Sequence, residues 1–149
     1  MIVISGLVIS SCKKTEDSGS PVGSNGSISL KVDGNTWNAS LSVQAVNSGG
    51  VINVTGSDSN AKQAGITLIG ANGTGTYKVG PNGIQGNMLR WTEGLASEQT
   101  YQATFIIGSG TIVVDKLNDS EISGSFEFEG YNTAQTSKTI TEGTFNARF

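Results

Sequence analysis

Residues 36–45 read TWNASLSVQA, and this stretch decides the fold class. Every second residue in it is apolar: Trp37, Ala39, Leu41, Val43 and Ala45. A period of two puts alternate side chains on opposite faces of an extended strand, whereas the 3.6-residue period of a helix would mix the two sets around its axis. The stretch therefore predicts a β-strand with one buried face and one solvent-facing side.

The same period of two continues through most of the chain from residue 27 onward. Before the opening stretch, Asp33 and Gly34 predict a tight turn between two strands. Near the other end, Phe126 and Phe128 alternate with polar neighbours. Strand-length segments recur about every 10 residues between Gly-rich turns, and we find no helical pattern. We predict an all-β protein, an antiparallel β-sandwich or flattened barrel of about ten strands with mostly meander connections.

The composition limits what the protein can bind. The chain has 149 residues, which suits a single core, and its net charge is -3 with only 14% charged residues. Ser, Thr and Asn supply the polarity, as expected for strands with hydroxyl-rich outer faces. Nucleic-acid binding depends on neutralising phosphates, and no basic cluster is present. We therefore exclude nucleic acid as a partner.

The chain contains no histidine. Acid–base catalysis by histidine, histidine-activated nucleophiles and imidazole metal ligands are excluded with it. Glu127 and Glu129 form the one carboxylate pair worth testing for glycoside hydrolysis. Because they alternate with Phe126 and Phe128, we interpret them as ordinary solvent-facing residues. We predict a protein that is not an enzyme and needs no cofactor.

Two acidic segments resemble metal-binding loops. Asp58 and Asn60 resemble the start of a calcium loop, but Lys62 stands where a third oxygen ligand is expected. Asp115, Asp119 and Glu121 gather around one predicted hairpin end and are weak calcium candidates. A turn accounts for the same residues without a metal, so we assign no metal site.

The N-terminus has the order of a secretion signal. Residues 1–9 are almost wholly apolar, two small residues follow, and the chain's single cysteine, Cys12, precedes a charged run at residues 13–17. This resembles the lipobox of bacterial lipoproteins, which implies cleavage before Cys12 and lipid on its thiol. The alternative is a first buried strand with an inert cysteine. Signal peptides open with basic residues, and residues 1–11 have none, so we expect the true start to lie upstream.

The resemblance implies a division of the chain into three parts. Residues 1–11 are the lipoprotein signal peptide, residues 12–26 are the lipidated cysteine and a flexible Gly/Ser-rich tether, and residues 27–149 are a single all-β domain. The lipid on Cys12 would anchor the protein in the outer membrane. Residues 13–17 are similar to the acidic export signals of Bacteroidota lipoproteins, which favours the cell surface. The alternative is that these residues are an ordinary solvated linker, in which case the protein could equally face the periplasm.

Candidate ligand-binding residues are those outside the cleanest alternation. Exposed aromatic rings on a rigid sheet can stack on sugars, and few polar groups then fix the orientation of the ligand. Trp91, with Arg90 beside it, and Tyr131 at a strand end are these candidates. Trp91 is in phase with Leu89, which favours a buried position for it. Trp37 begins the inward-facing series and is expected in the core.

Several motifs together resemble one family. They are LKVDGNTWNA at 30–39, Gly75 to Tyr77, GTIVVD at 110–115, ISGSFEF at 122–128 and EGTF at 142–145. The pattern is similar to that of small Bacteroidota lipoproteins whose domain has no assigned function. It implies the fold and a cell-envelope location and transfers no catalytic residue.

We therefore expect a cell-envelope lipoprotein with a non-enzymatic domain that binds a glycan or another small ligand. The alternative is a structural or accessory subunit of an envelope protein complex. Long, uncharged edge strands would favour the alternative, and a walled cavity would favour a ligand binder.

Overall fold

The computed structural model describes residues 26–149. The signal peptide at 1–11, the lipidation of Cys12 and the tether up to residue 25 lie outside the described residues. A single 3-10 turn, Ser97–Gln99, is the one helical element of the described part. The strands are β1 (Gly26–Val32), β2 (Asn35–Asn38), β3 (Ser42–Ser48), β4 (Val51–Ser57), β5 (Gln63–Ile69), β6 (Gly75–Val79), β7 (Met88–Thr92), β8 (Thr100–Ala103), β9 (Ser109–Leu117), β10 (Glu121–Tyr131) and β11 (Ser137–Arg148).

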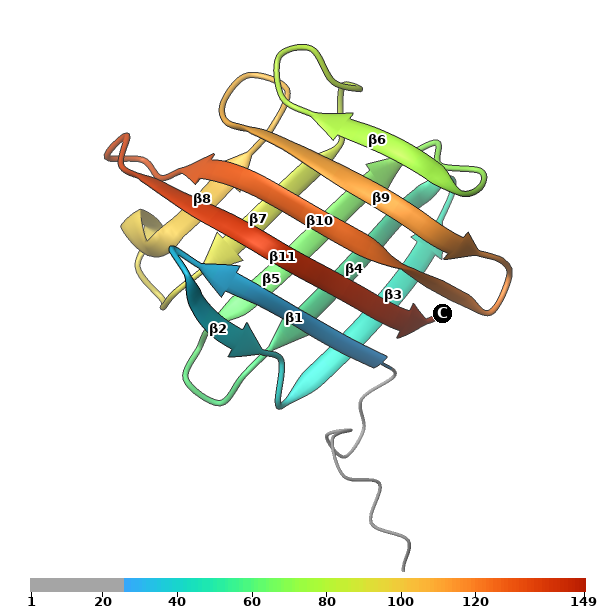
Figure 1. Cartoon of the computed structure of the whole chain (residues 1–149), viewed down its shortest axis with the longest axis horizontal. Coiled ribbons are helices and arrows are strands. Elements are labelled where there is room, and N and C mark those ends of the chain that lie inside the picture. Colours follow the sequence, from blue (N-terminus) through green and yellow to red (C-terminus); the bar gives the residue numbers. More distant parts are fainter. Residues whose placement is uncertain (1–25) are drawn as a thin grey trace, which may run out of the picture.

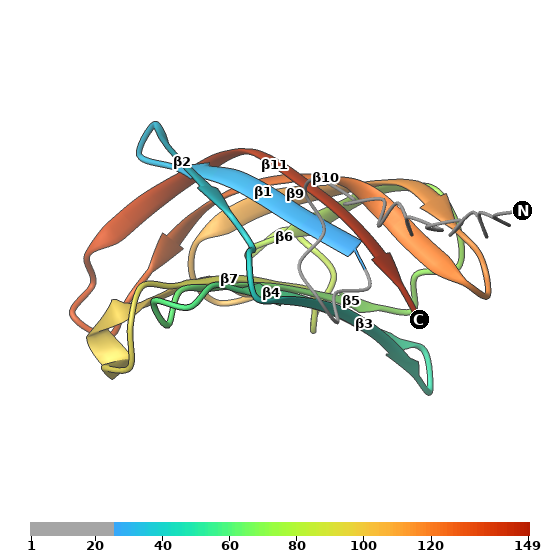
Figure 2. The same ribbon diagram turned by 90° about the horizontal axis from the view of Figure 1, so that it is seen from below.

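The strands form one antiparallel sheet that curls into a half-barrel with two layers. The arched layer has the order β2-β1-β11-β10-β9-β6, and the second layer has the order β8-β7-β5-β4-β3 (Figures 1 and 2). Strand β10 joins them because it pairs with β9 along most of its length and with β8 at Tyr131 and Gln102. The predicted all-β antiparallel fold is confirmed, with eleven strands.

Most connections are hairpins, as the meander prediction requires, but four pairings join strands that are not consecutive. They are β1 with β11, β5 with β7, β6 with β9, and β8 with β10. After β5 the chain leaves the second layer and forms β6, which pairs with β9 in the arched layer. The chain then returns to the second layer and forms β7 beside β5. This excursion places β6 beside β9 and completes the outer face described below.

The core lies between the two layers and is built from the inward-facing set of each strand. Leu30 and Ile140 from the arched layer and Val54, Leu68 and Leu89 from the second layer are each at most 1% exposed. With all these side chains directed inward, the polar set of every strand must face outward. The outer faces are therefore rich in Ser, Thr and Asn, and they are where a ligand has access.

The stretch at 36–45 is two strands and not one. Trp37 is buried in β2, and Val43 and Ala45 are buried in β3. Between them the chain crosses from the arched layer to the second: the N–H of Ala39 donates to Ile28 in β1, and the N–H of Leu41 donates to Ser57 in β4. The predicted inward position of Leu41 is wrong, since 55% of it is exposed at the crossing.

The predicted turn at Asp33 and Gly34 is confirmed. Both residues have positive φ, 46° and 87°, and they connect the paired residues Val32 and Asn35 as a two-residue hairpin. Asp33 also donates its N–H to the carbonyl oxygen of Thr139 and accepts the N–H of Thr139 at its carboxylate, both at 2.9 Å. The hairpin is therefore bonded to the start of β11.

Candidate functional site

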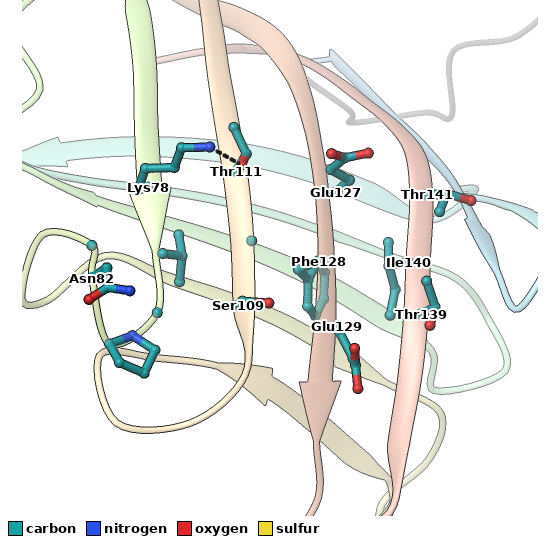
Figure 3. A pocket seen from close by; sticks show the side chains of 15 residues that line it. Lys78, Asn82, Ser109, Thr111, Glu127, Phe128, Glu129, Thr139, Ile140 and Thr141 are labelled. Atoms are coloured by element: carbon teal, nitrogen blue, oxygen red, sulfur yellow. Dashed lines mark hydrogen bonds between the residues drawn. The ribbon is translucent and has the colours of Figure 1, made fainter.

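A groove lies on the outer face of the arched layer, where β6, β9, β10 and β11 run side by side (Figure 3). The strand register aligns Lys78 with Thr111, and Thr111 with Glu127. A second row aligns Ser109 with Glu129. These side chains share the outer face because the residues that alternate with them, such as Phe128, are buried in the core.

A loop between β6 and β7 forms one wall of the groove, at residues 80–83. The N–H of Gly83 donates to the carbonyl oxygen of Gly80 at 2.9 Å, which closes a tight turn. Asn87, 1% exposed, holds the loop from beneath: its Oδ1 accepts the N–H of Ile69 at 2.9 Å, and its amide donates to the carbonyl oxygen of Lys78. The groove has a volume of about 650 Å³.

The groove offers hydrogen-bonding groups of several kinds. The ammonium of Lys78 donates to Oγ1 of Thr111 at 3.2 Å. The exposed carboxylate of Glu127 makes no hydrogen bond or ion pair within residues 26–149. Thr139 and Thr141 add further hydroxyl groups from β11. An extended polar ligand would find both donors and acceptors along the floor.

Glu129 is already engaged, since it accepts the hydroxyl hydrogen of Tyr131 at 2.7 Å. This hydrogen bond, together with the charge of Glu129, raises the pKa of the Tyr131 hydroxyl above its ordinary value. The hydrogen bond fixes the Glu129 side chain at the margin of the groove.

The structure brings two of the three predicted ligand-binding residues onto one outer surface. Arg90 in β7 is aligned with Gln102 in β8, and Gln102 is aligned with Tyr131 in β10. The guanidinium of Arg90 donates from Nη2 to Gln63 at 3.2 Å, while its Nε is buried without a partner among the described residues. Arg90, Gln102 and Tyr131 thus form a row across three strands. The row ends at the groove, because Tyr131 donates a hydrogen bond to the groove residue Glu129.

Trp91 faces the other way. It is 1% exposed and packs edge-on against Trp37, with 4.9 Å between the ring centroids. Its indole N–H donates to Glu93 at 3.1 Å. The structure thus separates Trp91 from Arg90 and Tyr131, and its ring presents no open face on which a sugar could stack. Trp37 is buried, as expected from its position in the sequence.

The calcium candidates do not come together as a metal site. Asp115 and Asp119 are exposed, and Glu121 pairs with Lys116, whose charge and hydrogen bond lower the pKa of Glu121. Asn118 shapes the turn, because its Oδ1 accepts the N–H of Glu121 at 3.0 Å. Within residues 26–149 no group of three or more acidic, histidine or cysteine side chains is arranged to hold a metal ion.

Asp58, the start of the calcium-like segment, instead bonds the two layers together. Its Oδ2 accepts the indole N–H of Trp37 at 2.8 Å, and its Oδ1 accepts the backbone N–H groups of Asn60 and Lys62. Desolvation tends to raise the pKa of Asp58. The hydrogen bonds from Trp37, Lys62 and Asn60 and the Lys62 charge outweigh it, so the pKa lies below its ordinary value.

The lowered pKa of Asp58 predicts a pH-dependent contribution to stability. The ionised form is favoured in the folded state, so its contribution is complete above the ordinary value of 3.8 and is lost as the pH falls through the lowered folded pKa. We expect Asp58→Asn to lower the free energy of unfolding at pH 7, with a smaller difference from the native protein at about pH 3. Urea denaturation at both pH values measures this. Asp119→Asn, at an exposed carboxylate, should match the native protein at both, and a pH-independent deficit in Asp58→Asn would contradict the assignment.

Sequence reasoning missed most of the groove. Nothing in the sequence marks Lys78, Thr111 or Thr139 as functional, because each is an ordinary polar residue on an alternating strand. The pairing of β6 with β9 brings them together, and no local pattern reports a pairing between strands that are not consecutive. The available signal was the outward position of Glu127 and Glu129, and the structure confirms that both line the outer face.

Residues 24–147 match the model of one protein family, described as "Domain of unknown function (DUF6252)". The match covers all but the last two residues of the described part. Comparison with curated proteins and with solved structures gives no significant match. Among residues 26–149 no helix has the length and apolar character needed to cross a membrane.

Proposed function

The chain belongs to the DUF6252 family, whose description assigns no function, and we propose from its own geometry that the domain is a non-enzymatic binding module for a glycan or another small polar ligand. The observation that carries the proposal is the groove across β6, β9, β10 and β11. Its volume of about 650 Å³ lies in the range of ligand sites.

The side chains in the groove favour a ligand rich in hydroxyl groups. Glu127 supplies unpaired acceptors, Lys78 supplies donors, and Thr111 and Thr139 do both. The ring of Phe128 turns into the core, so recognition rests on hydrogen bonds from the strands and not on stacking. The groove carboxylates favour binding without turnover. Glu129 is held by Tyr131, so of this pair Glu127 alone has no hydrogen-bond partner within residues 26–149, and hydrolysis of a glycoside needs two available carboxyl groups.

A glycan array followed by calorimetry of the positive glycans tests this function. We expect the native protein to bind, and Glu127→Gln or Thr111→Val to weaken binding by about tenfold or more, as the loss of a hydrogen bond to a charged or polar group implies. Glu98→Gln, at an exposed carboxylate outside the groove, is the control. Absence of glycan binding, or equal affinity in Glu127→Gln, would count against the groove.

We also propose that the module is anchored in the outer membrane through lipid on Cys12. The support is the lipobox resemblance at residues 1–17. The anchored domain faces either the cell surface or the periplasm, and the experiment distinguishes these two locations. In cells fed an alkyne fatty acid, the native protein should be labelled and Cys12→Ala should not. Protease treatment of intact cells then separates the two faces. Labelling of Cys12→Ala, or no labelling of the native protein, would remove the anchor.

A second function is favoured by the free edge of the second layer. Among the described strands β3 pairs only with β4, and β3, β4 and β5 contain no charged residue. Val46 on β3 is 54% exposed and Leu41 just before it is 55% exposed. Uncharged, exposed edge strands are suited to accepting a strand from another protein. This supports the alternative of an accessory subunit in an envelope complex.

Co-purification from detergent-solubilised membranes separates this alternative from ligand binding. If β3 is the contact, a partner should accompany the native protein and be lost from Val46→Lys, because a charge on the edge opposes strand addition. Ser59→Lys, in an exposed loop, should keep the partner. Retention of the partner by Val46→Lys, or a native protein that purifies alone, would argue for the groove as the functional site.

A further inference from the structure

A second hollow, which we call the tryptophan pocket, opens between the two layers. The arched layer contributes Asp33, Trp37 and Lys138. The second layer contributes Trp91 and Glu93, and the β4–β5 loop contributes Lys62. Its volume is about 310 Å³, and it shares no residue with the groove. The mouths of β-barrels are common ligand positions, and this hollow opens at the corresponding place in the half-barrel.

One ion pair in the pocket is fixed. Lys138 lies 2.9 Å from Oε1 of Glu93, and the same oxygen accepts the indole N–H of Trp91 at 3.1 Å. The ammonium of Lys138 also lies 5.6 Å from the ring centroid of Tyr101. Both members of the pair are about three-quarters buried, with 27% and 26% of their side chains exposed. They are therefore positioned before any ligand arrives.

The other two charged groups of the pocket, Lys62 and Asp33, form no ion pair within residues 26–149. The ammonium of Lys62 makes no hydrogen bond or ion pair within residues 26–149. Asp33 uses Oδ1 to accept the N–H of Thr139, and its Oδ2 has no partner in the same part of the chain. The charge of Asp33 acts on Lys138, so this lysine lies near two carboxylates, those of Asp33 and Glu93. The pocket thus offers a ligand one carboxylate oxygen of Asp33 and the ammonium of Lys62, whose charge also acts on Asp58.

We propose that the tryptophan pocket binds a small zwitterion, namely a free α-amino acid. Its carboxylate pairs with Lys62, its ammonium pairs with Oδ2 of Asp33, and its side chain packs beside Trp37. Charge-assisted bonds at both ends of the ligand match the two groups that have no direct partner among the described residues, the Lys62 ammonium and Oδ2 of Asp33. The volume is at the lower limit for ligand sites, which fits an amino acid and is too small for an oligosaccharide.

Intrinsic fluorescence tests this binding directly, because the chain has two tryptophans and both line this pocket, whereas neither lines the groove. The full chain is titrated with the common L-amino acids, with their N-acetyl derivatives, which lack the ammonium, and with their amides, which lack the carboxylate. We expect a saturable change in emission for at least one amino acid below about 10 mM, and binding at least tenfold weaker for both of its derivatives. No saturable change with any amino acid, or equal binding of either derivative, would overturn the proposal.

A lysine exchange then assigns the carboxylate contact. Lys62→Met keeps the aliphatic stem and removes the ammonium, so amino-acid binding should weaken at least tenfold while glycan binding in the groove is unchanged. The matched control, Lys78→Met, removes the groove lysine and should leave amino-acid binding as in the native protein. Native affinity in Lys62→Met, or equal losses in both variants, would overturn the site. Failure of the glycan test leaves these readouts unaffected, so the two sites are judged separately.

Discussion

The packing of two apolar sheet faces against each other is the constraint on which the rest of the molecule depends. Every strand has a period of two, so once residues such as Leu30, Val54 and Leu89 fill the space between the layers, each polar neighbour must face outward. The groove is a direct result. Its hydroxyl and charged groups are aligned by the strand register, and the core residues between them hold the strands in that register.

Two hollows of different character follow from this arrangement. The groove is built on one layer and is polar across its floor, while the tryptophan pocket is formed where the layers part and has buried rings in its walls. Asp58 and Glu93 each accept the indole N–H of one tryptophan. The indole donors are therefore satisfied within the protein, and the charges left for a ligand in the pocket are those of Lys62 and Asp33.

The sequence predicted the features that depend on neighbouring residues, namely the strands and one tight turn. The alternation gave the fold class, and the positive φ of Asp33 and Gly34 explains why that pair predicted the turn. Alternation does not report where the chain changes layer, so it predicts an inward position for Leu41, which is exposed. The groove could not be predicted because it needs β6 beside β9. The sequence indicates Arg90 and Tyr131 as two separate ligand-binding candidates. Their positions in one row depend on the pairing of both residues with Gln102, which the sequence does not reveal.

The pairing of β1 with β11 has a consequence for how the protein reaches this structure. The first and last strands of the domain are neighbours, with Gly26 opposite Ala147, and the bond between Asp33 and Thr139 spans 106 positions. Contacts between distant parts of a chain are slow to form, since a large loop must close first. The arched layer cannot be completed before the last strand has been synthesised. A chain still emerging from the ribosome is therefore kept unfinished by its own topology until synthesis is complete.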